Sequence, residues 1–455
     1  MTAAASTIRS LDSALFDRLR ETEYSRLDAD DQAYLDYTGS ALYSERQIAR
    51  HSERMRTSVL GNPHSENGPS LFSTSVINEA KRALLAFLGA PEEDYTVVFT
   101  ANTSAAIKLV AESYPFGSDV PLVLSTDNHN SMNGIREFAL ARGGNVRYIP
   151  LSQSLELDSP ESVLLSERGS ARGLFGYPAQ SNFSGIQHPL DLVRTAQRLG
   201  YRVLLDAAAF LPTSELSLRK TPADFVVLSM YKITGYPTGV GALVARHDAI
   251  AELKRPWFAG GTVEYASVQH RSHLLREHNG EGFEDGTPAF LSISAVTDGL
   301  ELLDEIGMKR INGHVTSMTR RFLAALREMK QKCGAPLVAI YGDSPNRGAT
   351  VAFNVLDVDG RVVSFARVVE RARNEGVSLR GGCFCNPGAS EIAFDFPLEK
   401  SRKCLAGTAD KGFTIDEFSR CLGPETAVGA VRASMGIPTN QRDLNRALSV
   451  IASFA

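Results

Sequence analysis

Between about residues 95 and 245, short apolar runs alternate with longer amphipathic stretches, and this alternation strongly constrains the fold. The run "YTVVFT" precedes "SAAIKLVAESY", and "PLVLST" precedes "SMNGIREFALARGG". Further apolar runs follow in "GLFGYPAQ", "YRVLLDAA", "DFVVLSMY" and "GVGALVA". Because strand–helix alternation is typical of parallel sheets that carry helices on their faces, the sequence predicts an α/β fold with a mostly parallel sheet.

After about residue 300 the pattern changes. Long helical stretches, "SAVTDGLELLDEIGMKRINGHVTSMTRRFLAALREMKQ", lead into strands such as "ATVAFNVLDV". This change predicts a second, smaller α+β domain. We therefore expect an N-terminal helical arm over 1–33, a large domain over 34–300 and a small C-terminal domain over 301–455.

Charge, hydropathy and cysteine usage argue against several classes of protein. The 48 basic and 52 acidic residues leave a net charge of −4, which gives no footprint for nucleic acid or an anionic membrane. No apolar run is long enough to span a membrane, and the N-terminus resembles an amphipathic helix rather than a signal peptide. Five cysteines in 455 residues do not form a disulfide scaffold, which predicts a reducing, cytoplasmic setting.

Polar side chains follow two of the predicted strands. Asp206 closes "YRVLLD", and Ser229 and Lys232 follow "DFVVL". A lone polar residue at a strand end is ordinarily a solvated surface residue. If the two strands are neighbours, however, an acid, a hydroxyl and a lysine meet in one crevice at the carboxyl end of the sheet, where ligands of such folds bind.

This set of side chains suits pyridoxal 5'-phosphate. The cofactor needs a lysine for its Schiff base and a carboxylate that keeps its ring nitrogen protonated. It also needs a phosphate cradle, which "VVFTANTSAAIKL" offers where Asn102, Thr103 and Ser104 open a helix. The residues therefore predict a pyridoxal phosphate site.

The chain resembles the class V aminotransferase family of fold-type-I pyridoxal phosphate enzymes, which includes the cysteine desulfurases. Within that family it is similar to the N-terminal domain of molybdenum cofactor sulfurases. The matching stretches, in family order, are "YLDYTGSALYS", "GNPHSENGPS", "VVFTANTSAAIKLVAE", "STDNHNSMNGIRE", "GYPAQSNFSG", "LLDAAAFLPT", "DFVVLSMYKITGYPTGVGALV", "FEDGTPAFL", "LRGGCFCNPGA" and "VRASMGI". At two positions, Tyr231 and Ala209, the chain departs from many cysteine desulfurases and follows the sulfurase pattern.

The resemblance implies roles for individual residues. Lys232 would form the Schiff base, Asp206 would pair with the ring nitrogen, and the His129 imidazole would stack on the ring. The phosphate would be bound by Thr103, Ser104, Ser229 and, from a second subunit, Thr287, which implies a homodimer. Asn182 would lie near the cofactor oxygen and the substrate, while substrate binding would involve Arg432, Arg380 and His64. An arginine suits the substrate carboxylate because its planar guanidinium pairs in a bidentate manner.

The stretch "LRGGCFCNPGA" holds two cysteines one residue apart. Aligned with the desulfurase relatives, Cys385 takes the position of the nucleophile that removes the substrate's sulfur as a persulfide. Cys383 then either takes no part or resolves the Cys385 persulfide or disulfide.

We therefore expect an enzyme that removes sulfur from L-cysteine, or from a related sulfur amino acid, through a Cys385 persulfide, with the sulfur acceptor left open. One alternative is a C–S lyase, epimerase or aminotransferase that acts on another amino acid. Another is a cysteine-rich metal-binding protein, built from Cys383, Cys385, Cys404 and Cys421. Structural zinc sites prefer two short C-x(2–4)-C pairs, and this spacing gives only one tight pair. We therefore predict no metal site and expect Cys404 and Cys421 to be buried, inert thiols.

Overall fold

A computed structural model describes residues 14–276, 280–407, 412–423 and 426–455. The first 13 residues of the predicted N-terminal helix lie outside this range, and residues 14–23 are helical. The helices that follow are α2 (Arg26–Ala29), α3 (Glu45–Thr57), α4 (Gly68–Phe87), α5 (Thr103–Ser113), α6 (Asn130–Asn133), α7 (Ile135–Ala141), α8 (Pro160–Ser166), α9 (Leu192–Arg198), α10 (Met230–Ile233), α11 (His247–Ile250), the 3-10 helix η1 (Glu281–Phe283), α12 (Phe290–Ile293), α13 (Val296–Ile306), α14 (Met308–Glu328), α15 (Phe365–Asn374), α16 (Pro387–Ala393), α17 (Leu398–Ala406), α18 (Ile415–Leu422) and α19 (Gln441–Ala452).

The predicted large sheet is present. In spatial order it contains β2 (Tyr95–Thr100), β8 (Gly241–Arg246), β7 (Phe225–Ser229), β6 (Tyr201–Asp206), β5 (Gly173–Pro178), β3 (Leu122–Ser125) and β4 (Val146–Ile149). Only β8 runs antiparallel to its neighbours. The structure thus confirms a mostly parallel sheet, with β4 as the strand that the sequence reading missed.

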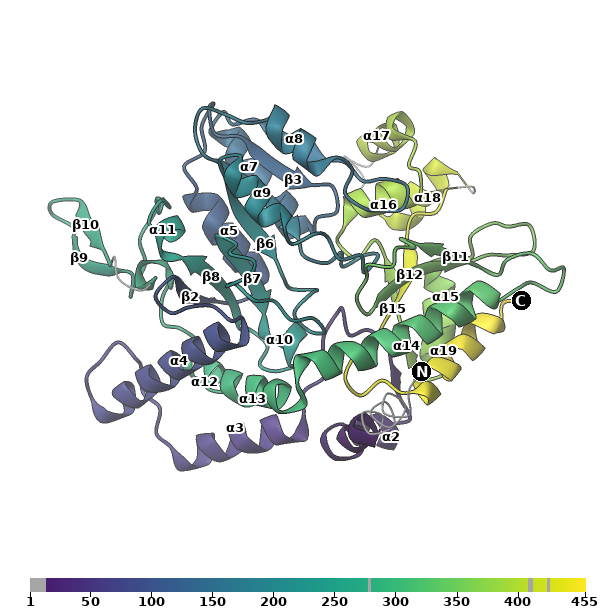
Figure 1. Ribbon diagram of the computed structural model, residues 1–455, viewed down its shortest axis with the longest axis horizontal. Coiled ribbons are helices and arrows are strands. Elements are labelled where there is room, and N and C mark those ends of the chain that lie inside the picture. The colour runs from purple at the N-terminus through teal and green to yellow at the C-terminus, as the bar shows by residue number, and fades with distance from the viewer. Residues whose placement is uncertain (1–13, 277–279, 408–411, 424–425) are drawn as a thin grey trace.

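Helices cover both faces of this sheet (Figure 1). Because side chains alternate along a strand, Val226 and Leu228 of β7 pack into the core beneath α4 and α9, whereas Phe225 and Val227 pack into the core beneath α5 and α7. Burial on both faces explains why these strands read as continuous apolar runs in the sequence.

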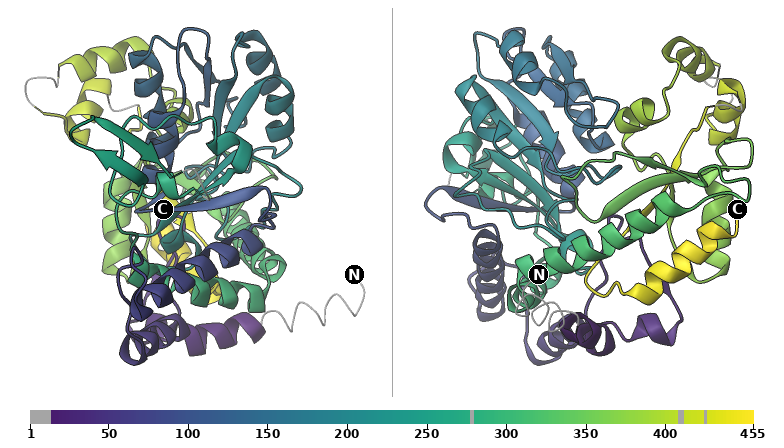
Figure 2. Two further views of the ribbon diagram at one scale, coloured as in Figure 1. Left: turned by 90° about the vertical axis from the view of Figure 1, so that its left-hand side faces the viewer. Right: turned by 45° about the vertical axis from the view of Figure 1, so that its right-hand side comes forward.

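A second, smaller sheet lies in the C-terminal part of the chain, in the lobe on the right of the right-hand view in Figure 2. It is antiparallel, in the order β11 (Val338–Tyr341), β12 (Thr350–Val355), β15 (Ala430–Ser434) and β14 (Arg380–Gly382). Helices α14 and α15 pack against these strands, and α19 packs against both helices. In β14 and β15, Arg380 stands directly opposite Arg432.

The N-terminal segment docks onto this C-terminal part. Strand β1 (Ala33–Tyr34) pairs in parallel with β13 (Val377–Ser378). The buried Arg20 guanidinium pairs with Asp443 at 2.8 Å, and the Phe16 ring stacks on His314 of α14 with 3.9 Å between ring centroids. These contacts carry the chain past β1 so that Asp36 bridges to Ser434 of β15.

One hairpin, β9 (Val263–Ser267) with β10 (Ser272–Leu275), extends away from the large sheet (Figure 1). Its exposed apolar side chains include Tyr265, Val268 and Leu274. Among the described residues, no helix combines the length and apolar character that a membrane crossing requires.

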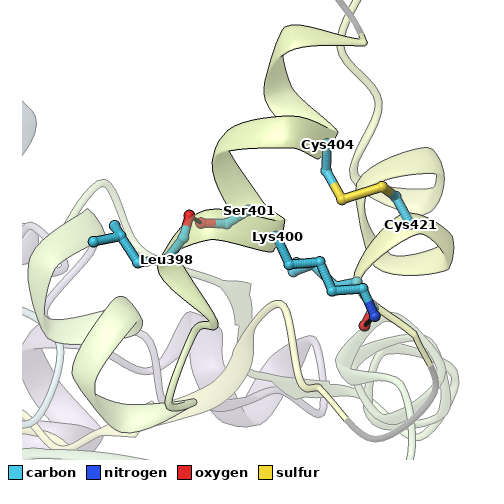
Figure 3. The surroundings of a disulfide bond; sticks show 6 residues. Leu398, Lys400, Ser401, Cys404 and Cys421 are labelled. Carbon is cyan, nitrogen blue, oxygen red and sulfur yellow. Dashed lines mark hydrogen bonds between the residues drawn. A yellow bond between two sulfur atoms is a disulfide. The ribbon is translucent and has the colours of Figure 1, made fainter.

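The structure corrects the expectation for two cysteines. Cys404 of α17 and Cys421 of α18 form a disulfide, as Figure 3 shows, so they are not inert free thiols. Cys404 is buried with Phe418 and Leu422, whereas Cys421 is exposed. The two helices also share this small apolar cluster and a hydrogen bond from Lys400 Nζ to the Leu422 carbonyl at 2.7 Å.

Candidate active site

One cavity of about 420 Å³ lies at the carboxyl ends of the parallel strands of the large sheet. The predicted cofactor residues that line it follow the ends of five strands, β2, β3, β5, β6 and β7. The residues that were predicted from the sequence and that line it are Thr103, Ser104, His129, Asn182, Asp206, Ser229 and Lys232. The parallel register explains this convergence, because β2, β3, β5, β6 and β7 all end at the same edge.

The cavity wall at the start of α5 fits a phosphate group. Asn102 caps this helix by accepting a hydrogen bond from the Ala105 N–H at 2.9 Å, and Thr103 begins the helix. Gly241 of β8 packs so closely here that a Cβ would lie 2.4 Å from the Asn102 carbonyl carbon, so only glycine permits this approach.

Two hydroxyls of this wall support the same assignment. Among the described residues, Thr103 Oγ1 and Ser229 Oγ are buried and make no hydrogen bond of normal geometry, although the Tyr231 phenol lies near Ser229. Buried polar atoms ordinarily find a partner. A phosphate at this helix start would supply one, so the residues fit pyridoxal phosphate.

Lys232 and Asp206 line the same cavity. Asp206 is buried at the end of β6, and its Oδ1 accepts a hydrogen bond from the Ala208 N–H at 3.0 Å. Lys232 follows β7 on the short helix α10. Burial lowers the pKa of Lys232 from its ordinary value, and the charges of Arg432 and Arg380 act in the same direction. A lysine with a lowered pKa holds more of the neutral amine that attacks a carbonyl group.

His129 is held in one orientation by its own helix. It caps α6, and its Nδ1 accepts a hydrogen bond from the Ser131 N–H at 3.1 Å. The neutral ring must therefore carry its proton on Nε2. Burial lowers the pKa of His129, which favours this neutral form. A neutral imidazole in a fixed plane suits the predicted stacking role.

The two predicted substrate arginines share one carboxylate, that of Asp36. Arg380 contacts it three times, through Nε at 3.0 and 2.9 Å and through Nη2 at 2.6 Å. Arg432 contacts it through Nη2 at 3.0 Å. Because Arg380 and Arg432 are cross-strand partners, Asp36 separates two like charges that would otherwise repel. Burial lowers the pKa of Arg432 to about 10, and Asp36 opposes this shift.

Cys385 and Cys383 are both exposed free thiols on the loop between β14 and α16. The Asn130 N–H donates to the Cys385 carbonyl at 2.7 Å, and Asn182 Nδ2 donates to the Phe384 carbonyl at 2.6 Å. Because His129, next to Asn130, and Asn182 both line the cavity, these contacts place the loop beside it. Between the two cysteines, Phe384 is buried, and the Arg432 guanidinium lies over its ring at 4.7 Å. The loop thus lies against Arg432.

The predicted site residues that do not line this cavity are Arg380, Arg432, Cys385, Thr287 and His64. Thr287 is exposed. A Cβ at Gly261 would lie 2.9 Å from the His64 ring and 3.3 Å from the Gly286 carbonyl, so His64 lies beside the segment that carries Thr287. Thr287 and His64 are thus both exposed and lie near each other, and their roles remain predictions.

Sequence reasoning overlooked several residues that belong to this region. Gln180 and Tyr231 line the cavity, and Asp36, Ser131 and Asn386 hold its functional side chains. Asp36 lies in the matched stretch "YLDYTGSALYS", and Asn386 stands before a proline in a typical helix-capping position, so each had a signal that was not used.

In the described part of the chain, no group of three or more His, Cys, Asp or Glu side chains is arranged to hold a metal ion.

Comparisons with known proteins agree with this geometry. A sequence model of the family "Aminotransferase class-V" matches residues 33–446. The chain is similar to the molybdenum cofactor sulfurase of Arabidopsis thaliana, with 35% identity over 480 residues that cover 96% of this chain and 58% of the relative. It therefore spans a little over half the length of that relative. The resemblance inferred from the sequence is confirmed.

Solved structures show the same fold. A cysteine desulfurase from Thermococcus onnurineus superposes with a TM-score of 0.79 at 22% identity, over 96% of this chain and 97% of that one. A C-DES variant with glycine covalently linked to its pyridoxal phosphate superposes with a TM-score of 0.72 at 16% identity, over 96% and 99%. The predicted fold class is confirmed.

Proposed function

The chain belongs to the class V aminotransferase family, and on this premise we propose that it is a pyridoxal phosphate enzyme that transfers sulfur from L-cysteine, or a related sulfur amino acid, to Cys385. The observation that carries the proposal is the meeting of Lys232, Asp206 and two buried hydroxyls without a hydrogen bond of normal geometry in one cavity, with the Cys385 loop beside it. The similarity to molybdenum cofactor sulfurases supports the sulfur chemistry.

Pyridoxal phosphate, when bound, supplies the electron sink that weakens bonds to the substrate's α-carbon. In this chain, Thr103, Ser104 and Ser229 would hold the phosphate, and Asp206 would pair with the protonated ring nitrogen. Asp206 is suited to this because it is buried and its Oδ1 is oriented by the Ala208 N–H. The lowered pKa of Lys232 gives it the free amine that binding the cofactor's aldehyde requires.

Arg432 would bind the substrate carboxylate. Its Nη1 donates to the Asn182 carbonyl at 2.9 Å and its Nη2 pairs with Asp36, while its buried Nε has no partner among the described residues. The guanidinium is therefore held in a fixed plane and retains a donor. A substrate carboxylate would be the natural acceptor for it.

The sulfur step proposed for Cys385 balances without a further reagent. The Cys385 thiolate attacks the sulfur of the bound L-cysteine, so an S–S bond forms at Cys385 as the substrate's C–S bond breaks. The electron pair of the C–S bond stays on carbon, which takes up a proton and yields L-alanine. Cys385 keeps the sulfur as a persulfide for a thiol acceptor.

We also propose that the enzyme is a homodimer. Thr287 is exposed with His64 beside it, and apolar side chains of α4, including Leu71 and Phe72, face outward. A second copy that covers these residues would bury them and bring Thr287 to a neighbouring phosphate site.

The proposed cytoplasmic location rests on the free thiols of Cys383 and Cys385, and the Cys404–Cys421 disulfide weighs against it.

Product analysis tests the proposed reaction. With L-cysteine and a reductant, the wild-type enzyme should form L-alanine and sulfide in equal amounts, and Lys232→Ala should form neither. Formation of pyruvate and ammonia instead would identify a C–S lyase. If L-cysteine changes the cofactor's visible spectrum but no product forms, the substrate class is wrong.

A further inference from the structure

The backbone of the Cys385 loop, residues 383–386, is held in an unfavourable conformation. Phe384 and Cys385 are consecutive non-glycine residues with φ values of 56° and 57°. Side chains disfavour this left-handed region, so such a conformation persists only where surrounding contacts hold it in place. The loop must therefore be fixed by its neighbours, and the contacts that do so decide where the thiol points.

Asn386 makes several of these contacts. Its Nδ2 donates to Asp127 Oδ1 at 2.6 Å and to Asn182 Oδ1 at 3.0 Å. Its Oδ1 accepts from the Ala389 N–H at 3.2 Å and so caps α16. Asn182 in turn donates to the Phe384 carbonyl at 2.6 Å. One fully buried amide thus links the loop, the following helix and a side chain of the cavity wall.

Asp127 anchors this amide from the large sheet. Its carboxylate is fully buried, and it accepts a hydrogen bond from the Ser181 hydroxyl at 2.8 Å and contacts His188 Nε2 at 2.8 Å. Asp127 lies two residues before His129. Asn130, which follows His129, donates its N–H to the Cys385 carbonyl at 2.7 Å. The segment that orients the His129 imidazole therefore also holds the backbone of Cys385.

From these contacts we propose that Asp127 and Asn386 are positioning residues that hold the Cys385 thiol at the cavity, and so decide that Cys385 rather than Cys383 receives the sulfur. The proposal rests on the proposed function and deepens it. We call Asp127 and Asn386 the latch. Among the described residues, the backbone of Cys383 contacts the latch only through its carbonyl, which accepts from the Asn386 N–H at 3.0 Å. Neither Asp127 nor Asn386 need touch the substrate to act in this way.

Asn386→Ser separates positioning from capping. Serine still caps α16, but it is too short to donate to Asp127 and Asn182. The matched control is Asn440→Ser, because Asn440 caps α19 in the same manner, by accepting from the Asp443 N–H at 3.1 Å. A second variant, Asp127→Asn, removes the charge of the anchor and keeps its shape.

Two measurements on the holoenzyme test the latch. In the first, iodoacetamide alkylation without substrate, followed by mass spectrometry, gives the ratio of the Cys385 rate to the Cys383 rate. Asn386→Ser and Asp127→Asn should change this ratio several-fold, and Asn440→Ser should leave it unchanged. In the second, sulfide release from L-cysteine should show kcat lowered about 10- to 100-fold in both latch variants with little change in KM, because a small displacement of a reacting atom costs that much.

The proposal is overturned if both latch variants keep the wild-type alkylation ratio and kcat, or if the ratio changes while kcat does not. It is also overturned if Asn440→Ser shows the same losses, because capping alone would then explain them. The alkylation ratio needs no turnover. If the wild type released no sulfur from L-cysteine, the proposed function would fail while the ratio still decided the latch.

Discussion

At the scale of single residues, the site is built around a charge pattern. Arg432 has 3% of its side chain exposed and Arg380 has 47%, yet both pair with the one carboxylate of Asp36. Removing a buried, hydrogen-bonded charge costs far more than removing an exposed one. The two arginines should therefore differ in their effect on substrate binding.

Arg432→Ala should raise KM for L-cysteine by a factor that corresponds to about 2–5 kcal/mol, or roughly 30-fold and more. Arg380→Ala should raise it by much less. The visible spectrum of the bound cofactor should be the same in both variants, because neither residue lines the cofactor cavity. Steady-state kinetics measures KM for both variants. An equal rise in KM for the two variants would contradict the proposal that Arg432 binds the substrate carboxylate.

Lys232 carries a second prediction at this scale. Its pKa is lowered by burial and by the nearby arginines, so the neutral amine forms at a lower pH than in an ordinary lysine. The rate at which cofactor-free enzyme takes up pyridoxal phosphate should therefore rise with pH and level off below pH 10.4, the value for a free lysine. Stopped-flow absorbance measures this rate. A rate that continues to rise to that pH would contradict the assignment.

At the scale of elements, the helix over residues 14–23 depends on a buried histidine. His314 of α14 stacks on Phe16 and donates from Nε2 to the Thr439 carbonyl at 2.9 Å. Burial lowers the pKa of His314 from 6.5 to about 4. A histidine whose pKa is lowered by folding is still neutral in the folded state at a pH where the unfolded chain has already protonated it. Its contribution to stability is therefore present above pH 6.5 and lost as the pH falls toward 4.

The free energy of unfolding should fall by on the order of 2 kcal/mol between pH 6.5 and pH 4 because of His314. Urea unfolding at several pH values measures this slope in the wild type and in His314→Gln, which lacks the titrating group. The difference between the two slopes should appear in that window. Parallel slopes would show that another group controls acid unfolding.

The elements themselves show what the sequence could and could not predict. The apolar runs between residues 95 and 245 gave their strands correctly, because burial on both faces leaves a local signal. The contacts that hold the Cys385 loop and the arginines leave no such local signal in the sequence. Asp36 pairs with Arg432 across 396 positions, and the φ values of Phe384 and Cys385 follow from contacts with Asn182 and Asn130. The Cys404–Cys421 bond was missed because their spacing of 17 residues does not reveal that α17 and α18 lie together.

At the scale of the whole molecule, one subunit holds most of the proposed site but not all of it. The proposed phosphate wall contains Thr103, Ser104 and Ser229, whereas Thr287 is exposed and does not line the cavity. The account therefore requires a second copy to bring Thr287 to this wall. The apolar side chains on the outside of α4 and on the β9–β10 hairpin are candidates for the contact surface.

Sedimentation of the holoenzyme should give the mass of two chains. Thr287→Ala should keep the dimer but release pyridoxal phosphate faster during dialysis, because one hydrogen bond to the phosphate is lost. Thr22→Ala, a change at another exposed threonine, serves as the control and should retain the cofactor as the wild type does. A monomer that retains the cofactor, or a Thr287→Ala variant with normal retention, would contradict the dimeric site.

The central claim is that Cys385 receives the sulfur. After one turnover with L-cysteine, mass spectrometry should find the additional sulfur atom on Cys385 in the wild type and in Cys383→Ser. Cys385→Ser should still change the cofactor spectrum on binding L-cysteine but carry no added sulfur, because an alcohol is a poor nucleophile toward sulfur. Added sulfur on Cys383 with Cys385 dispensable, or full sulfide release by both serine variants, would contradict the account.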